Sequence, residues 1–127
     1  MRREVVLPVD RHAATRAREA LDAAVPPELG QRVDDARLAV SEVVTNAVLH
    51  GGLGPDDTIR IVFETDATTL RVEVEQRTDA PAAAISAPPS PDLGSVGGFG
   101  LMLVSRVVDD WGVEPGPPGR VWFELRR

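Results

Sequence analysis

A carboxylate and a carboxamide, Glu42 and Asn46, lie four residues apart near the middle of this 127-residue chain. Residues at that spacing on a helix lie one above the other, so the two side chains share a face. The surrounding segment predicts a helix, because its apolar residues recur at the spacing of one buried stripe: Val40, Val43, Val44 and Ala47. If this face is covered, the pair forms a polar site; if it is exposed, the pair has little energetic consequence.

The face that carries Glu42 and Asn46 is predicted to point nearly opposite the valine stripe, at about 100° of turn per residue. Its neighbours are Leu38, Ala39 and Leu49, which a freely solvated face would not carry. We therefore expect a second element, a lid or a ligand to cover this face.

A glycine-rich segment, Gly94–Gly100, leads directly into Leu101–Val108, whose apolar residues have helical spacing. Glycines that open a helix let backbone N–H groups approach and hold an anion, which the helix dipole also favours. A flexible hinge is the alternative interpretation, and for a glycine cluster in isolation it is the more common one. The combination with Glu42 and Asn46 favours an anion site.

Composition excludes several classes of function. The length suits one domain, residues 1–127. The formal net charge is −6 and no basic run is present, so we expect no nucleic-acid partner. The chain has neither Lys nor Cys, which excludes lysine-based chemistry, disulfides and zinc–thiolate sites. No apolar run is long enough for a membrane span or a signal peptide, so no membrane partner and a cytoplasmic location are the default expectations.

In chain order, the patterns predict a strand, two helices, two strands, an irregular segment, a helix and two strands. Pro8 suggests that the first strand lies at a sheet edge, and Asp10 is a candidate N-cap of the first helix. Trp111, Trp122 and Phe123 are expected in the core. The order implies a mostly antiparallel sheet with helices on one face, an α/β two-layer sandwich. The predicted bounds are 4–9, 10–24, 28 or 31 to 50, 58–64, 70–75, 101–108, 111–114 and 120–125.

The irregular segment, residues 77–97, is rich in proline and has no apolar periodicity. Such a length without structure inside a compact domain often belongs to a functional lid. We expect the part from about Pro81 to Val96 to be poorly ordered without a nucleotide or a partner, because it has no apolar face to bury.

Two motifs together, Glu42-x-x-x-Asn46 and Gly98-Phe99-Gly100-Leu101-x-Leu103-Val104, with a closing Trp-Gly strand, resemble the GHKL ATPase superfamily. The short length is similar to that of the bacterial anti-sigma factor serine/threonine kinases, and the likeness covers nearly the whole chain in element order. It implies a Bergerat-type ATP-binding fold with ATP and Mg²⁺ between helices and sheet. It also implies two partners in transcription regulation by partner switching: a sigma factor, and a small STAS-type antagonist that is phosphorylated on serine. The resemblance leaves open whether the chain forms a homodimer.

The resemblance implies roles for individual residues. Asn46 matches the Mg²⁺-binding asparagine, and Glu42 matches the acidic residue that accepts the proton of the attacking serine hydroxyl. Gly98 and Gly100, with the adjoining Leu101, match the lid segment that holds the phosphates. Two further side chains have alternative interpretations: Arg106 either meets an anion or is simply exposed, and His50 is either a ligand or a complement to the helix dipole.

One departure from the family pattern concerns the base. Where the family has Asp-x-Gly, whose carboxylate fixes the adenine amino group, this chain has Gln76-Arg77-Thr78, and Asp79 follows. A glutamine carbonyl accepts one hydrogen bond without charge. Losing a charged acceptor costs about 1.5–3 kcal/mol, or roughly one to two decades in affinity. A weakly ATP-binding or nucleotide-free pseudokinase is therefore one alternative. A detached histidine-kinase catalytic domain is another, disfavoured because no phosphoacceptor helix pair is present.

Overall fold

The computed structural model describes residues 1–77, 96–115 and 118–127, with side chains from residue 101 onward in the second range. Regular structure follows the predicted order, with one short 3₁₀ helix, η1, in addition. The elements are β1 (Arg2–Pro8), α1 (Ala13–Ala24), η1 (Pro27–Leu29), α2 (Arg32–His50), β2 (Thr58–Thr65), β3 (Thr69–Arg77), α3 (Val96–Val107), β4 (Asp110–Glu114) and β5 (Arg120–Arg126).

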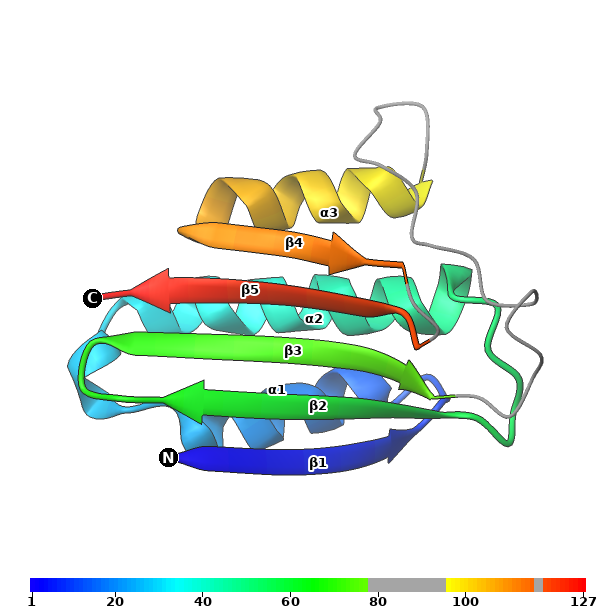
Figure 1. Ribbon diagram of the computed structural model, residues 1–127, viewed down its shortest axis with the longest axis horizontal. Helices are drawn as coiled ribbons and strands as arrows, with labels where there is room; N and C mark the ends of the chain where they lie inside the picture. Colours follow the sequence, from blue (N-terminus) through cyan, green and yellow to red (C-terminus); the bar gives the residue numbers. More distant parts are fainter. Residues whose placement is uncertain (78–95, 116–117) are drawn as a thin grey trace.

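The strands form one sheet in the order β1-β2-β3-β5-β4, and each neighbouring pair is antiparallel. Helices α1, α2 and α3 lie on the same side of this sheet (Figure 1). The prediction of a two-layer α/β sandwich is confirmed. β1 lies at an edge of the sheet, as Pro8 suggested.

Alternation along the strands decides which side chains enter the core, because successive residues of a strand point to opposite faces. Ile59, Ile61 and Phe63 of β2 are buried against the helices, and so are Leu70, Val72 and Val74 of β3. Phe123 is fully buried and Trp111 packs against the core. The prediction for Trp122 is wrong: as the neighbour of Phe123 it lies on the opposite face, where Arg71 stacks 4.4 Å from its ring centroid.

Helix α1 starts later than predicted. Its N-cap residue is His12, without a side-chain cap bond, so the prediction of Asp10 as N-cap is wrong. Asp10 instead accepts a hydrogen bond from the His12 N–H at 2.8 Å. Such local side-chain-to-backbone bonds of Asp form a turn and compete with helix formation. Its buried side chains are Ala13, Ala17, Leu21 and Ala24.

Helix α2 packs between α1 and α3. The Arg32 guanidinium at its first turn donates to the Val107 carbonyl at the end of α3 at 3.0 Å and to Asp109 at 3.1 Å. The helix ends where predicted, with Gly51 as C-cap. Gly51 has a φ of −82°, in the right-handed region, whereas the next residue, Gly52, is left-handed with a φ of 70°.

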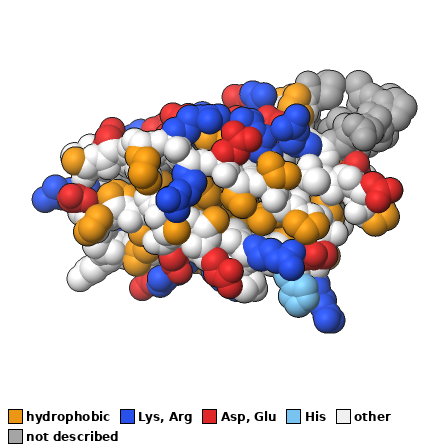
Figure 2. All heavy atoms as spheres, turned by 90° about the horizontal axis from the view of Figure 1, so that it is seen from below, with side chains coloured by type: hydrophobic (Ala, Val, Ile, Leu, Met, Phe, Trp, Pro, Cys, Tyr) orange, Lys and Arg blue, Asp and Glu red, His pale blue; other side chains and the backbone are white. Residues whose placement is uncertain are grey.

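Helix α3 begins at Val96, five residues before the predicted start, so Gly97, Gly98 and Gly100 lie within it. The expected disorder of 81–96 concerns residues that lie almost entirely outside the described ranges. Within those ranges, no helix combines the length and hydropathy needed to cross a membrane. On the side of the molecule shown in Figure 2, acidic and basic side chains are interspersed among apolar ones.

Candidate functional site

Glu42 and Asn46 occupy the margin of the buried face of α2. Asn46 is buried, with 9% of its surface exposed, and Glu42 is half-buried. The prediction that they point opposite the valine stripe is wrong for Asn46, because three residues of helix bring it to within about 60° of Val43. Asn46 therefore lies beside the core, and Glu42 lies one step further toward the surface.

The prediction of a covered face is only partly correct. Ala39 is fully buried, and α3 packs along α2. Leu38 and Leu49, however, are 37% and 66% exposed. Both leucines lie further from the buried stripe than Glu42 does, measured around the helix axis. The part of this helix face that is covered therefore includes Asn46 and ends near Glu42.

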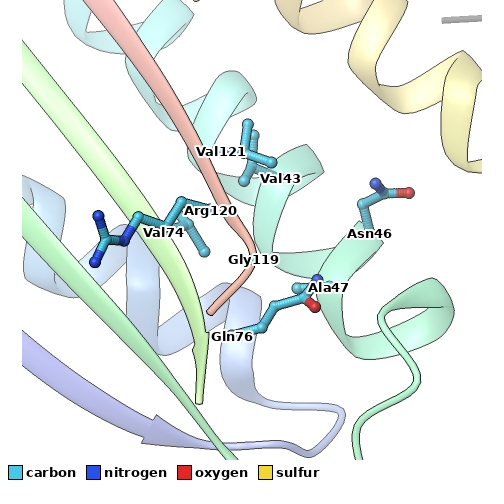
Figure 3. Close-up of a pocket in the computed structure, with 8 residues that line it drawn as sticks. All are labelled: Val43, Asn46, Ala47, Val74, Gln76, Gly119, Arg120 and Val121. Carbon is cyan, nitrogen blue, oxygen red and sulfur yellow. The ribbon is translucent and has the colours of Figure 1, made fainter. Parts of the chain in front are cut away.

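A pocket opens beside Asn46, between α2, the end of β3 and the start of β5. It is lined by Val43, Asn46, Ala47, Val74, Gln76, Gly119, Arg120 and Val121. In Figure 3 the side chains of Val43 and Val121 lie close together, and those of Asn46 and Gln76 lie at the side of α2. The cavity volume is about 10 Å³, the space of roughly one water molecule. A larger ligand would have to extend beyond these eight residues.

Gln76 is the most informative residue of the pocket. It is the last inward-facing residue of β3 and only 5% exposed. Its Oε1 is buried without a hydrogen-bond partner, and no other side-chain atom in the described residues shares that state. An unpaired buried acceptor costs about 1–3 kcal/mol, so such an atom requires an explanation. A ligand that donates a hydrogen bond at this place would remove the cost.

Arg120 contributes only the base of its side chain to the pocket. Its guanidinium points away (Figure 3) and donates to Glu75 on the outer face of the sheet at 2.9 Å. That hydrogen bond raises the pKa of Arg120. The other polar side chains that line the pocket are two neutral carboxamides, Asn46 and Gln76, set against valine side chains.

For a metal ion, the described residues offer no group of three or more His, Cys, Asp or Glu side chains. Mg²⁺ does not require such a group, because it usually keeps several waters and shares one or two protein oxygens with substrate phosphates. The Asn46 carbonyl is an oxygen donor of the required kind. The residues present therefore fit Mg²⁺ that arrives with a nucleotide, and not a metal centre held by protein ligands alone.

The other predicted site residues are only partly brought together. Thr78 and Asp79 lie outside the described residues. Gly98 and Gly100 lie in the first turns of α3, and Leu101 is 1% exposed within the core. Arg106 and His50 are exposed in the last turns of α3 and α2.

Sequence reasoning missed Gly51 as a part of the site. A Cβ built there would lie 2.7 Å from Gln76 Nε2 and 3.0 Å from its Cδ. The predicted bounds place this position only just after the end of a helix, at residue 50. No local pattern could have shown the contact, because Gln76 comes from a strand 25 residues further along the chain.

The molecule thus has an antiparallel sheet covered on one face by helices, with Glu42 and Asn46 on the central helix and an unpaired acceptor at the end of β3. The sequence model of the histidine kinase-like ATPase domain matches residues 8–122. The chain therefore belongs to this family. Comparison with curated proteins finds no match.

Among solved structures, the chain is similar to the RsbU and RsbW domains of Rv1364c from Mycobacterium tuberculosis, with a TM-score of 0.65. The match covers 100% of this chain and 32% of the other, at 18% sequence identity. At that identity the likeness concerns the fold. Because the chain spans about a third of that protein's length, the partners and activity of the larger protein do not transfer without a test.

Proposed function

We propose that this domain binds Mg-ATP and acts as an anti-sigma regulatory factor with serine/threonine kinase activity. The single observation that supports nucleotide binding most directly is the buried, unpaired Oε1 of Gln76 in a pocket with valine walls. The exocyclic amino group of an aromatic base, most of which would extend beyond the eight lining residues, could donate a hydrogen bond to that oxygen. Membership of the histidine kinase-like ATPase family supports the same conclusion.

In this proposal Asn46 and Glu42 serve the other end of the nucleotide. The Asn46 carbonyl oxygen binds Mg²⁺, and the Gly98–Gly100 backbone at the start of α3 faces the phosphates. Bound Mg-ATP supplies the phosphoryl group that a serine hydroxyl of the antagonist receives. Glu42 accepts the hydroxyl proton, and its half-buried position at the limit of the α3 cover leaves it accessible to a protein substrate.

Calorimetric titration of the full chain with Mg-ATP tests the binding. Asn46→Ala should weaken binding about tenfold or more, because a charge-assisted contact is lost. Gln31→Ala, which removes an exposed carboxamide at the N-cap of the same helix, is the matched control and should bind like the wild type. Absence of any Mg-ATP binding would refute the nucleotide part of the proposal and favour the nucleotide-free pseudokinase.

The kinase activity has its own test. Glu42→Gln should leave the Mg-ATP affinity within about threefold while lowering serine phosphorylation by at least 100-fold, because a general base acts on the chemical step. Transfer of ³²P from ATP to a co-purified antagonist gives the readout. Equal transfer rates for Glu42→Gln and the wild type would remove Glu42 from the reaction.

The proposed partners, a sigma factor and a small STAS-type antagonist, come from the resemblance to anti-sigma kinases and from the fold likeness to a protein with an RsbW domain. A pull-down with the tagged chain from its native cell tests them. Recovery of both proteins supports the regulatory role. Recovery of a histidine-containing dimerisation protein instead would favour a histidine-kinase catalytic domain.

A further inference from the structure

The amide of Gln76 is held at one position in the pocket. Its backbone N–H donates to the Gly119 carbonyl at 2.9 Å, so the end of β3 remains attached to the chain that enters β5. The side chain then extends toward α2 (Figure 3). It lies against Gly51, the C-cap of that helix. A methyl group at Gly51 would stand 2.7 Å from Nε2, so the amide packs as closely as a glycine permits.

The position of the amide does not fix its orientation, that is, which of its two ends carries the oxygen. A carboxamide carries an acceptor and two donors of nearly equal size, and a half-turn about its terminal bond exchanges them. Because Oε1 has no hydrogen-bond partner among the described residues, a half-turn breaks no hydrogen bond at that atom. A carboxylate at the same place would offer acceptors only.

The two purines differ in the pattern that such an amide can match. Adenine presents an amino donor at position 6 and an acceptor at N1, whereas guanine presents an oxo acceptor at position 6 and a donor at N1. In one orientation the Gln76 amide pairs with the adenine pattern, and after a half-turn it pairs with the guanine pattern. We propose that Gln76 makes this site accept adenine and guanine nucleotides with comparable affinity. The inference rests on the nucleotide binding proposed above and concerns which bases that site takes.

Equilibrium titrations of the full chain with Mg-ATP, Mg-GTP and the Mg complex of purine riboside triphosphate test the inference. The wild type should bind the first two within about tenfold of each other. Purine riboside triphosphate has no substituent at position 6 and should bind roughly tenfold more weakly than either, since one neutral hydrogen bond is lost.

Two variants test whether the amide reads the base. Gln76→Asn keeps both donor and acceptor, so the ATP and GTP affinities should stay within about tenfold of each other. Gln76→Met offers neither a donor nor a strong acceptor, so it should weaken the binding of ATP and of GTP alike, each by about tenfold or more. If one variant fails to fold, the wild-type titrations and the other variant still decide.

The outcomes are distinguishable. If ATP binds and GTP binds more than 100-fold more weakly, the inference is overturned and the proposed ATP binding stands. Equal affinity for all three nucleotides, or unchanged ATP and GTP affinities in Gln76→Met, also overturns it, because the amide then does not read position 6 of the base. If no nucleotide binds, both the inference and the proposed function fail.

Discussion

Two adjacent residues at the end of β3, Glu75 and Gln76, are equally buried and lie on opposite faces of the sheet. On the outer face, the Glu75 carboxylate lies 2.9 Å from Arg120, 3.6 Å from Arg60 and 3.6 Å from Arg77. On the inner face, the Gln76 Oε1 has no partner. Burial alone therefore does not separate a structural polar residue from a functional one.

The difference lies in where the partners come from. The chain supplies the arginine partners of Glu75, Arg77 from β3 itself and Arg60 and Arg120 from the neighbouring strands. This carboxylate is therefore paired whether or not a ligand is present. Gln76 is desolvated to the same degree but is left unpaired within the described residues, which is a cost to stability that a hydrogen-bond donor from outside the chain would offset. We therefore expect substitutions at the two positions to change stability in opposite directions.

The largest effect is expected for Glu75→Ala. Removal of the carboxylate deletes its charge-assisted hydrogen bond to Arg120 and leaves three arginines close together, which should lower the free energy of unfolding by about 1.5–3 kcal/mol. Urea denaturation followed by circular dichroism measures it. Glu64→Ala, an exposed position of β2, is the control and should change stability by less than about 0.5 kcal/mol. Equal midpoints for the two variants would contradict a structural role for Glu75.

A smaller effect of opposite sign is expected for Gln76→Met. Methionine has a similar shape and no strong acceptor, so the penalty of the unpaired oxygen disappears and stability should rise by about 1 kcal/mol. The same variant should bind Mg-ATP more weakly than the wild type. The control is Gln31→Met at an exposed position. A loss of stability in Gln76→Met would show that the amide already has a partner within the folded chain.

Much of the fold could be predicted from the sequence because its signals are local. The predicted order of the elements is correct, the valine stripe of α2 is buried, and the predicted end of that helix at residue 50 is correct. The exceptions have local causes too. Asp10 forms a turn that precedes α1, and Trp122 follows the alternation of β5 onto the outer face.

The site could be predicted only in part, because its geometry depends on contacts between distant segments. Glu42 and Asn46 were found from their spacing, but a spacing does not say which of them is buried. Gln76 was noticed as a departure from Asp-x-Gly, and its sequence context favoured weak nucleotide binding. Only the packing against Gly51 and the missing partner of Oε1 identify this residue as an unpaired acceptor in a pocket.

The smallest effect concerns the row of ion pairs that extends from Glu75 toward the sheet edge. Arg60, which pairs with Glu75, also donates to both carboxylate oxygens of Glu4 on β1, at 2.6 and 2.8 Å. These hydrogen bonds lower the pKa of Glu4 below its ordinary value. A carboxyl group whose pKa is lower in the folded state contributes stability above its unfolded pKa, about 4.3 for Glu, and loses it as the pH falls through the folded-state pKa.

Between pH 6 and pH 3, the urea midpoint of the wild type should therefore fall further than that of Glu4→Gln, which has no carboxyl group to protonate at this place. Glu64→Gln is the control, because Glu64 takes part in no ion pair among the described residues, and its acid limb should match the wild type. The difference should be small, because both Glu4 and Arg60 contact solvent and exposed ion pairs contribute little. If the urea midpoints of Glu4→Gln and the wild type fall equally between pH 6 and pH 3, the Glu4–Arg60 pair does not contribute to stability. The contrast between paired outer residues and the unpaired Gln76 is then confined to Glu75.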